Sequence, residues 1–506
     1  MMPGTAITDR SGDAEKLSLT LLLAGGEKEQ SRSRIALLLH IVVVAVVLGS
    51  VSYALDVSLP PGDLVDFYCG LIVAVSAWMF ATWLAIGRPL FEPYPMFVGI
   101  VLAFHAGFVP LRVFGVESSI YLLPDLSTRT LAASLLVVVL GLLFLHLGAL
   151  VALAPSRSEY RDVGEHRAAW LRRVGLVLSL VALPATVLQM KEGMAAVALG
   201  GYRELFLTES SYGPFTVIRN IAADLQLTGA FFLLASSRGK RLIAAAALVL
   251  IVFESGYYLI LGHRAYAALP LLATAWLWHK TIKPLPLFPM FVAGLLTSVA
   301  VFPLIGETRG LIGGFELSGL VASSGTGSLL NGARSLVAEA GGTLMTVGYT
   351  IDLVPASRPF ELGATYVGAA ANAIPMIHWP WPYGFGSDWL AWTVRPDWAA
   401  NGFGFGYSFL AEGYLNFGWV GVPLVAAILG AVCIVMMRWS GKDEARLAAV
   451  ATVLPTLLFY VRGESVDLIR PFLWRAVLPY LLVEALVRFA RRTSLDGDVV
   501  RGSHGR

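Results

Sequence analysis

Long apolar stretches alternate with short polar segments over most of the chain. Each stretch is close to the ~20 residues that a helix needs to cross the ~30 Å hydrocarbon core of a bilayer. The pattern therefore predicts an all-α polytopic membrane protein with about twelve membrane-spanning helices. The predicted spans are 35–54, 67–87, 95–113, 130–154, 174–190, 214–235, 242–262, 265–279, 285–305, 407–437, 447–462 and 472–489.

Two features interrupt this regular alternation. The apolar run 407–437 is longer than one crossing requires, so we expect its helix to tilt or to break near Gly418 and Gly421. Residues 306–406 form a polar-to-amphipathic loop far longer than an ordinary connection, and such long loops tend to carry function. Within it, 329–336 and 343–354 have helix-like or re-entrant patterns.

The predicted segments are an N-terminal tail (1–34), helices one to nine (35–305), the large loop (306–406), helices ten to twelve (407–489) and a C-terminal tail (490–506).

Positive residues gather in the loops that follow the even-numbered spans. Since Lys and Arg near span ends remain in the cytoplasm, these loops are predicted to be cytoplasmic. Both termini are then cytoplasmic, and the loop 306–406 is extracytoplasmic. The first outer loop instead carries Asp56, Asp63 and Asp66 without a lysine. The basic residues are Arg157, Arg161, Arg167, Arg172, Arg173, Arg238, Lys240, Arg241, Lys280, Lys283, Arg438, Lys442, Arg446, Arg488, Arg491 and Arg492.

Composition adds several exclusions. Apolar residues make up 57% of the chain and charged residues 14%, with a mean hydropathy of +0.71. The chain has no CxxC, HExxH or His cluster typical of a metal site, so no metal or other cofactor is expected. It has no phosphate-binding glycine loop that would indicate a nucleotide-driven enzyme, and no basic stripe for nucleic acid. Cys69 and Cys433 lie in different spans, so no disulfide framework is expected.

Three arginines at or just inside the outer span ends are the main candidate anion ligands. An arginine in hydrocarbon is costly unless it is paired or faces water, and a lipid-linked phosphate is the obvious anion at this depth. Arg264 follows a Gly-containing turn, whereas Arg470 precedes Pro471, a residue typical of helix starts, and Arg475 follows one turn later. Snorkelling or structural pairing is the alternative for each. Weaker candidates are Arg203, Arg309 and Arg334, the last of which also has the spacing to pair with Glu339.

The segment 402–421, GFGFGYSFLAEGYLNFGWVG, places Glu412 in an otherwise apolar helix beside Tyr414 and Asn416. A carboxylate at this depth requires either a structural partner or a function. The functional interpretations are a general base for a sugar hydroxyl or a ligand of the acceptor hydroxyl, and Glu339 is the second candidate for the base. Tyr414 and Asn416 are candidate sugar-binding residues.

The stretch 374–382 of the large loop carries His378, Trp379 and Trp381 among prolines. These aromatic residues suit either the membrane interface or stacking on sugar rings. His378 is a further candidate for the base, with a structural role as the alternative.

Three motifs in the C-terminal half resemble a known family. GFGFGYSFLAEGYLNFGWVG is similar to the G-x-G-x-S-x-x-A-E-x-Y-x-N-F-G motif of O-antigen polysaccharide polymerases, the Wzy family. ARSLVAEAGGTLMTVGYTIDLVP (333–355) resembles the family's Arg-x-x-x-x-Glu-x-Gly-Gly stretch, and LGHRAYAALPLL (261–272) its Gly-x-Arg element, with His263 at a position that is usually small. The N-terminal half resembles the family only in hydropathy.

The resemblance implies a GT-C-like, multi-pass enzyme of the bacterial inner membrane. Such enzymes polymerise oligosaccharide repeat units carried on undecaprenyl pyrophosphate at the outer face, and the growing glycan moves to the next lipid-linked unit. Inversion at the anomeric carbon without a metal is implied, with outer arginines holding the leaving pyrophosphate. The expected partners are the lipid-linked donor and acceptor and membrane lipid, and whether a chain-length regulator binds is left open. The product is O-antigen, capsule or exopolysaccharide.

Two other classes share these sequence features. A polysaccharide-unit flippase would also be a multi-span protein with cavity arginines, but it is expected to show internal hydropathy repeats, which this chain lacks. An O-antigen ligase uses the same lipid donor with a different acceptor, and its usual His-bearing loop pattern is not evident in this sequence. The pattern therefore favours a polymerase.

Overall fold

The computed structural model describes residues 10–116, 125–153, 165–201, 204–205, 214–308, 328–374 and 384–503. Within these ranges the regular structure is entirely helical, which confirms the all-α prediction. Among the described residues, eight helices are long and apolar enough to cross a membrane, so the chain is a polytopic membrane protein. These eight spans are 28–56 of α1 (Arg10–Asp56), α2 (Pro61–Ile86), α5 (Thr128–Leu153), 167–200 of α6 (Glu165–Gly200), 215–235 of α8 (Pro214–Ala235), α9 (Arg241–Ile260), α18 (Phe409–Ser440) and 444–462, which comprises α19 (Glu444–Phe459) and η3 (Tyr460–Arg462).

The remaining predicted spans coincide with helices outside this set of eight. The span expected at 95–113 is two helices, α3 (Pro93–His105) and α4 (Phe108–Val113). It breaks at Gly107, where a Cβ would lie 2.9 Å from the Gly341 backbone. The span expected at 265–279 is α10 (Arg264–Thr281), and the one at 285–305 is α11 (Leu287–Thr308). The span expected at 472–489 covers η4 (Phe472–Val477) and the start of α21 (Leu478–Ser503). The count of twelve crossings therefore stays a prediction.

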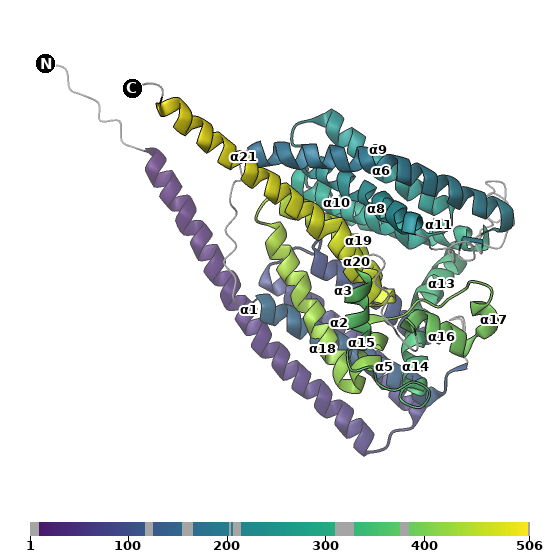
Figure 1. Ribbon diagram of the computed structural model, residues 1–506. Helices are drawn as coiled ribbons and strands as arrows, with labels where there is room; N and C mark the ends of the chain where they lie inside the picture. The colour runs from purple at the N-terminus through teal and green to yellow at the C-terminus, as the bar shows by residue number, and fades with distance from the viewer. Residues whose placement is uncertain are drawn as a thin grey trace.

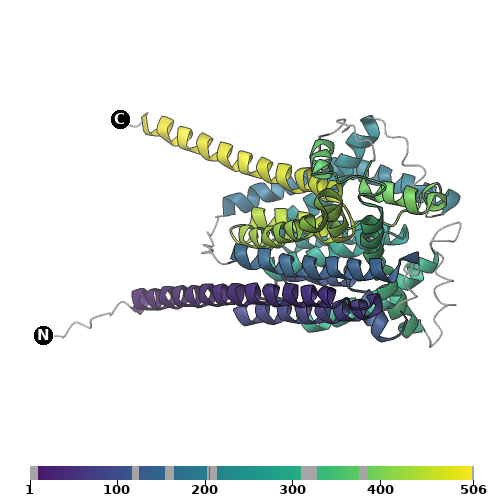
Figure 2. The same cartoon turned by 90° about the horizontal axis from the view of Figure 1, so that it is seen from below.

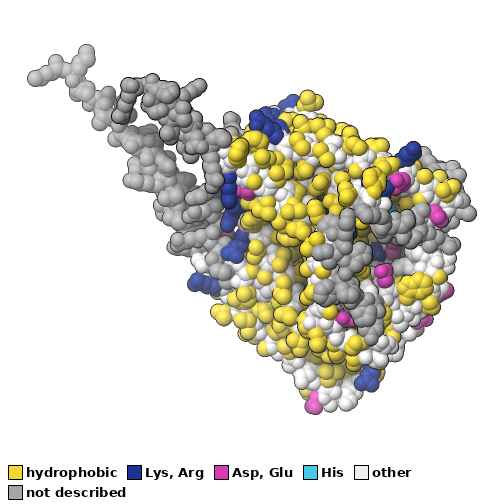
Figure 3. All heavy atoms as spheres, viewed as in Figure 1, with side chains coloured by type: hydrophobic (Ala, Val, Ile, Leu, Met, Phe, Trp, Pro, Cys, Tyr) yellow, Lys and Arg dark blue, Asp and Glu magenta, His cyan; other side chains and the backbone are white. Residues whose placement is uncertain are grey.

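The two ends of the helix bundle differ in what they carry. Figures 1 and 2 show the start of α1 and the end of α21 (Leu478–Ser503) projecting from the same end of the bundle. The helices of the large loop lie at the opposite end. On the face shown in Figure 3, Lys and Arg gather mostly toward the first end, Asp and Glu toward the second, and apolar side chains cover the area between them. The loop helices are α13 (Ser328–Gly341), α14 (Thr343–Leu353), α15 (Ala364–Asn372), α16 (Gly386–Val394) and α17 (Pro396–Ala399).

Helix α18 contains the break expected near Gly418. Phe417 (φ −135°, ψ 18°) and Gly418 (φ 59°, ψ −143°) leave the helical conformation, and Gly418 adopts a positive φ that glycine tolerates. A Cβ on Gly421 would lie 1.9 Å from the carbonyl oxygen of Gly413. Residues eight apart in a continuous helix are about 12 Å apart, so the short segment 409–416 must fold back on the long one. The run 407–437 is thus a short re-entrant helix followed by a span.

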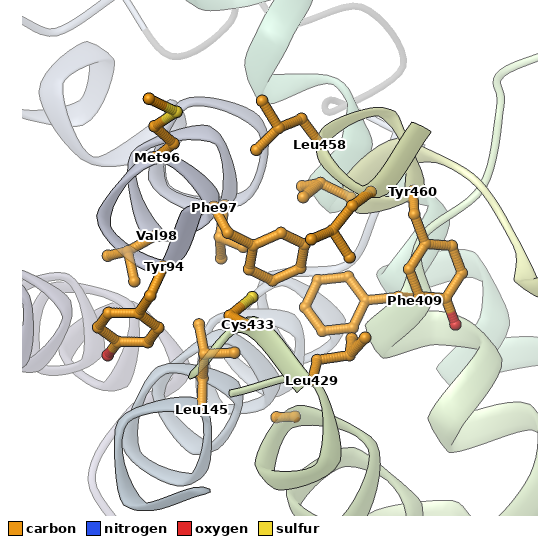
Figure 4. Close-up of a cluster of buried hydrophobic side chains, with 14 of the residues drawn as sticks. Tyr94, Met96, Phe97, Val98, Leu145, Phe409, Leu429, Cys433, Leu458 and Tyr460 are labelled. Atoms are coloured by element: carbon orange, nitrogen blue, oxygen red, sulfur yellow. The ribbon is translucent and has the colours of Figure 1, made fainter. Parts of the chain in front are cut away.

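The core around this hairpin joins α3, α5, α18 and α19. Figure 4 shows Phe97 and Phe409 facing each other, with Cys433 and Leu145 beneath them and Tyr460 beyond. The ring centroids of Phe97 and Phe409 are 5.9 Å apart, and those of Phe409 and Tyr460 are 6.0 Å apart. Such packed aromatic rings fix the start of α18 against η3.

Glycines bring α5 and α18 into close contact. A Cβ on Gly148 would lie 1.9 Å from the carbonyl oxygen of Ala427, and one on Gly430 would lie 1.9 Å from that of Leu145. Small residues that permit backbone contact are typical of helix association in membranes, where burial from water supplies no driving force. The α5–α18 contact therefore provides the rigid support for the re-entrant segment.

The C-terminal helix does not begin where the sequence indicated. Pro471 is the last residue of α20 (Ser465–Pro471), so the prediction that it starts a helix is wrong. The helix starts six residues earlier because Glu464 and Asp467 form a reciprocal capping box that satisfies its first N–H groups. The chain then continues through a π-helical turn, η4 (Phe472–Val477), into α21. Pro471 therefore lies inside a helical segment, directly before the π-helical turn, and both features are typical of places where a helix bends.

Candidate active site

Glu412 lies in the first turn of the re-entrant helix. Ser408 caps that helix, and its Oγ accepts hydrogen bonds from the backbone N–H groups of Leu410 (3.1 Å) and Ala411 (3.4 Å). His105 Nε2 from α3 lies 2.7 Å from the same hydroxyl. These contacts fix the first turn so that Glu412 enters the protein interior, where it is only 1% exposed.

The Glu412 carboxylate is held by neutral donors from the C-terminal part of the chain. Its Oε2 accepts hydrogen bonds from the Ser465 backbone N–H (2.8 Å) and the Tyr460 hydroxyl (3.2 Å), and its Oε1 lies 2.5 Å from Ser465 Oγ. Ser465 is the first residue of α20, whose N-terminus favours negative charge. Among the described residues no Lys, Arg or His side chain bonds to this carboxylate. The partners of Glu412 among the described residues are therefore neutral, and no salt bridge to an arginine of this part of the chain holds it.

Asn416 connects the re-entrant helix to the large loop. Its Nδ2 donates to Thr365 Oγ1 (2.7 Å) and to the carbonyl oxygen of Glu412 (2.8 Å). Its Oδ1 accepts a hydrogen bond from Gly363 N (2.9 Å). Asn416 is fully buried, and these three bonds place α15 beside the Glu412 side chain.

Tyr414 lies in the short segment 409–416 of α18, just before the break at Phe417 and Gly418. Its ring packs against Phe360, with 6.1 Å between centroids, and against Trp419 at 5.5 Å. The tyrosine is 6% exposed, whereas Trp419 is 42% exposed. Trp419 and Phe360, which is 37% exposed, are therefore the members of this aromatic group that are open to a ligand or to lipid, and neither was predicted as a site residue.

Glu464 is a second buried carboxylate at the same helix start, and it was not among the site residues predicted from the sequence. It is 3% exposed. Its oxygens accept hydrogen bonds from Gly386 N (2.7 Å), Ser387 N (3.2 Å) and the Asp467 backbone, and Oε1 lies 2.5 Å from Ser387 Oγ. Burial raises the pKa of Glu464 to about 8, and the charge of Glu412 contributes to that rise. The signal in the sequence was the acidic pair at capping-box spacing.

Arg264 and Glu339, predicted separately as an anion ligand and a base, bond to each other. Arg264 Nη1 donates to Glu339 Oε2 and joins the start of α10 to α13. The arginine side chain is 9% exposed and the glutamate side chain 45% exposed. The Arg334–Glu339 pairing that the spacing suggested is therefore replaced by a longer-range pair, while Arg334 is exposed on α13.

Arg475 and Arg470 differ in their surroundings. Arg475 Nη2 donates to Asp224 Oδ1 of α8 at 2.6 Å, and the Arg475 carbonyl oxygen accepts from the Thr228 hydroxyl at 2.9 Å. Arg470 is half-buried near the end of α20 and forms no ion pair with a described residue. Arg470 is thus more available to an added anion than Arg475.

A row of aromatic rings links these arginines to the Glu412 site. Tyr266 lies two residues after the start of α10, and its ring is 5.5 Å from that of Tyr258 and 5.1 Å from that of Phe459. Arg475 lies in η4, which packs against α19, the helix that ends at Phe459. Phe459 immediately precedes the tyrosine that bonds to Glu412. The C-terminal ends of α9 and α19, the start of α10 and η4 therefore border one region.

Arg358 connects separate parts of the large loop and was not predicted to be functional. Its side chain is fully buried, and its Nε donates to Glu361 Oε1 at 2.9 Å. Its guanidinium also lies 4.9 Å from the Trp389 ring centre and donates to the Gly384 carbonyl oxygen at 3.3 Å. A buried charge is stable only when it is paired in this way, so Arg358 fixes the loop.

Five of the predicted site residues lie outside the described residues, namely Arg203, Arg309, His378, Trp379 and Trp381. Their roles therefore stay predictions.

Comparison with known proteins gives one match that covers most of the 506-residue chain. The model of the family described as "O-antigen polysaccharide polymerase Wzy" matches residues 37–493. No curated protein matches the chain, and no solved structure does.

Proposed function

Because the chain belongs to the O-antigen polysaccharide polymerase Wzy family, we propose that it joins undecaprenyl-pyrophosphate-linked repeat units at the outer face of the inner membrane. Family membership makes it a polysaccharide-polymerising glycosyltransferase that acts on lipid-linked repeat units. It also favours this activity over the ligase and flippase alternatives. The observation that carries the mechanistic part is the buried, hydroxyl-bonded Glu412 beside a region bordered by arginines.

The proposed topology places both termini in the cytoplasm and residues 306–406 outside. Arg and Lys near the ends of spans favour the cytoplasmic side. Lys and Arg gather mostly toward the end of the bundle from which α1 and α21 project. The large-loop helices lie at the other end, and the hydrogen bonds of Asn416 to Gly363 and Thr365 place the Glu412 site beside them. The reaction would then take place on the side where lipid-linked units are presented after translocation.

Glu412 is the proposed general base. The acceptor hydroxyl oxygen attacks the donor's anomeric carbon from the face opposite the pyrophosphate, and the bond from that carbon to the phosphate oxygen breaks. The electron pair leaves on the pyrophosphate, and Glu412 receives the hydroxyl proton. This displacement inverts the anomeric carbon and needs no metal for proton transfer. Glu339 is less suited to the role because it is exposed and paired with Arg264.

Arginines are proposed to hold the leaving pyrophosphate, whose negative charge grows as the bond breaks. Guanidinium groups bind phosphate oxygens bidentately and stay charged at working pH. Arg470 has no ion-pair partner among the described residues, which favours it as a first ligand. Arg264 would join when pyrophosphate displaces the exposed Glu339 carboxylate, and Arg475 when it competes with Asp224. Arg334 is exposed on the helix that carries Glu339.

Glycan length in cells tests the proposed activity. A strain that lacks this chain is expected to carry surface glycan with a single repeat unit, and the wild-type gene should restore a ladder of lengths. Retention of lipid-linked polymer without surface glycan would instead indicate a ligase, and units trapped inside the cell would indicate a flippase. Either pattern would contradict the proposal.

A further inference from the structure

The start of α20 brings together two buried carboxylates. Glu412 is 1% exposed and Glu464 is 3% exposed, and the two are linked through Ser465, which follows Glu464 in the chain and bonds to Glu412 through both its N–H and its hydroxyl. Each carboxylate is held by hydroxyl and backbone donors. Within the described part of the chain, no cationic side chain bonds to either one.

Two negative charges in such a place would repel each other in a medium of low dielectric constant. Closely spaced carboxylates that lack a cation commonly hold one proton between them, because the second ionisation is opposed by the first. The proposed reaction requires Glu412 to be ionised, so that it can accept the hydroxyl proton. Glu464 is then the carboxyl group of the pair that stays protonated.

The contacts of Glu464 allow it to be neutral. Its Oε2 accepts from Gly386 N at 2.7 Å, as a carbonyl oxygen can. Its Oε1 lies 2.5 Å from Ser387 Oγ, and a serine hydroxyl can accept as well as donate. A protonated Glu464 can therefore donate to Ser387 without losing its other bonds.

The remaining titratable groups around Glu464 add little positive charge. Asp467 on α20 and Asp388 on α16 are acidic, and burial raises the pKa of both. The tyrosines that interact with it, Tyr407 and Tyr460, carry neutral hydroxyls. The nearby guanidinium of Arg358 is bonded to Glu361.

We infer that Glu464 keeps its proton while Glu412 is ionised, so that the pair carries the single negative charge needed by the base. This inference rests on the proposed function. Glu464 is a positioning residue: it does not contact the reacting atoms, but it determines where the charge of the pair lies. Its own raised pKa, about 8, agrees with this assignment.

Infrared spectroscopy of the purified full-length protein tests the inference, because the C=O stretch of a protonated carboxyl is distinct from that of a carboxylate. The wild type should show a protonated-carboxyl band at pH 7 that is lost near about pH 8. Glu464→Gln should lack this component. Asp397→Asn, which removes an exposed carboxylate of the same loop, should retain it.

Glu412→Gln tests the coupling from the other side and does not depend on the folding of a Glu464 variant. Without the neighbouring charge, the band of Glu464 should be lost at a pH at least about one unit lower. A Glu464→Gln spectrum identical to that of the wild type, or an unshifted midpoint in Glu412→Gln, would overturn the inference.

The same variants separate this inference from the proposed function. If Glu412→Gln polymerises normally, Glu412 is not the base, whatever the infrared band shows. If Glu412→Gln is inactive but the wild-type protein lacks a protonated-carboxyl band from Glu464, only the proton assignment is wrong.

Discussion

Replacing Gly421 by alanine should open the hairpin that carries Glu412. The added Cβ would lie 1.9 Å from the carbonyl oxygen and 2.7 Å from the carbonyl carbon of Gly413. These are backbone atoms, so no side-chain rotation can relieve the clash. Cβ atoms essentially never lie closer than 3.0 Å to another atom, so the two segments must separate by about 1 Å.

The size of the effect follows from this displacement. Overpacking of this kind typically costs about 1–3 kcal/mol of stability. A shift of about 1 Å in a reacting group can lower the rate about 100-fold. We therefore expect Gly421→Ala to lose activity more severely than stability, because the re-entrant helix can move away without unfolding the bundle.

The assay is polymerisation of a defined lipid-linked repeat unit by purified protein, together with the thermal unfolding midpoint. Gly70→Ala is the matched control, since nothing lies within 4 Å of a Cβ at that position in α2. There alanine should leave activity intact and gain up to about 1 kcal/mol from helix propensity. A Gly421→Ala enzyme with the wild-type rate would refute the close packing of the two segments and the positioning argument built on it.

Three further predictions concern the arginines, the metal and the orientation. Arg264→Lys keeps the charge but loses the bidentate fork, so the polymerisation rate should fall by about tenfold or more, and Arg264→Ala should be worse; a fully active lysine variant would rule out pyrophosphate binding by this residue. Activity in vitro should survive EDTA, and a loss restored by a divalent ion would contradict the arginine-based mechanism. A cysteine introduced at the exposed Ser357 should react with an impermeant reagent from the outer face of intact cells. The two native cysteines, Cys69 and Cys433, are buried and should give little background labelling. Reaction only after permeabilisation would reverse the topology.

Helix positions and the break in α18 could be read from the sequence because local rules govern both. Apolar runs of span length become helices, and a glycine that adopts a positive φ ends one. The same local reading misplaced the start of the C-terminal helix, since Pro471 resembled a helix start. The capping box at Glu464 and Asp467 competes with that pattern, and its bonds are visible only in the structure.

The candidate site was predictable in part. Glu412 was identified because a carboxylate in an apolar helix is rarely incidental. Its partners could not be identified, because Tyr460 and Ser465 lie about fifty residues further along and meet it only through the hairpin. The pairing of Arg264 with Glu339 was missed for the same reason, as the two are 75 residues apart and nearer acids and bases offered alternative partners.

The central claim is that Glu412 removes the acceptor proton. Single-turnover bond formation between purified enzyme and a defined lipid-linked repeat unit measures this step directly. We expect Glu412→Gln, which preserves size and hydrogen bonding but is a far weaker base, to slow the step by about 100-fold or more. The unfolding midpoint should stay near that of the wild type, and Asp397→Asn should react at the wild-type rate. A Glu412→Gln enzyme that forms the glycosidic bond as fast as the wild type would contradict the account.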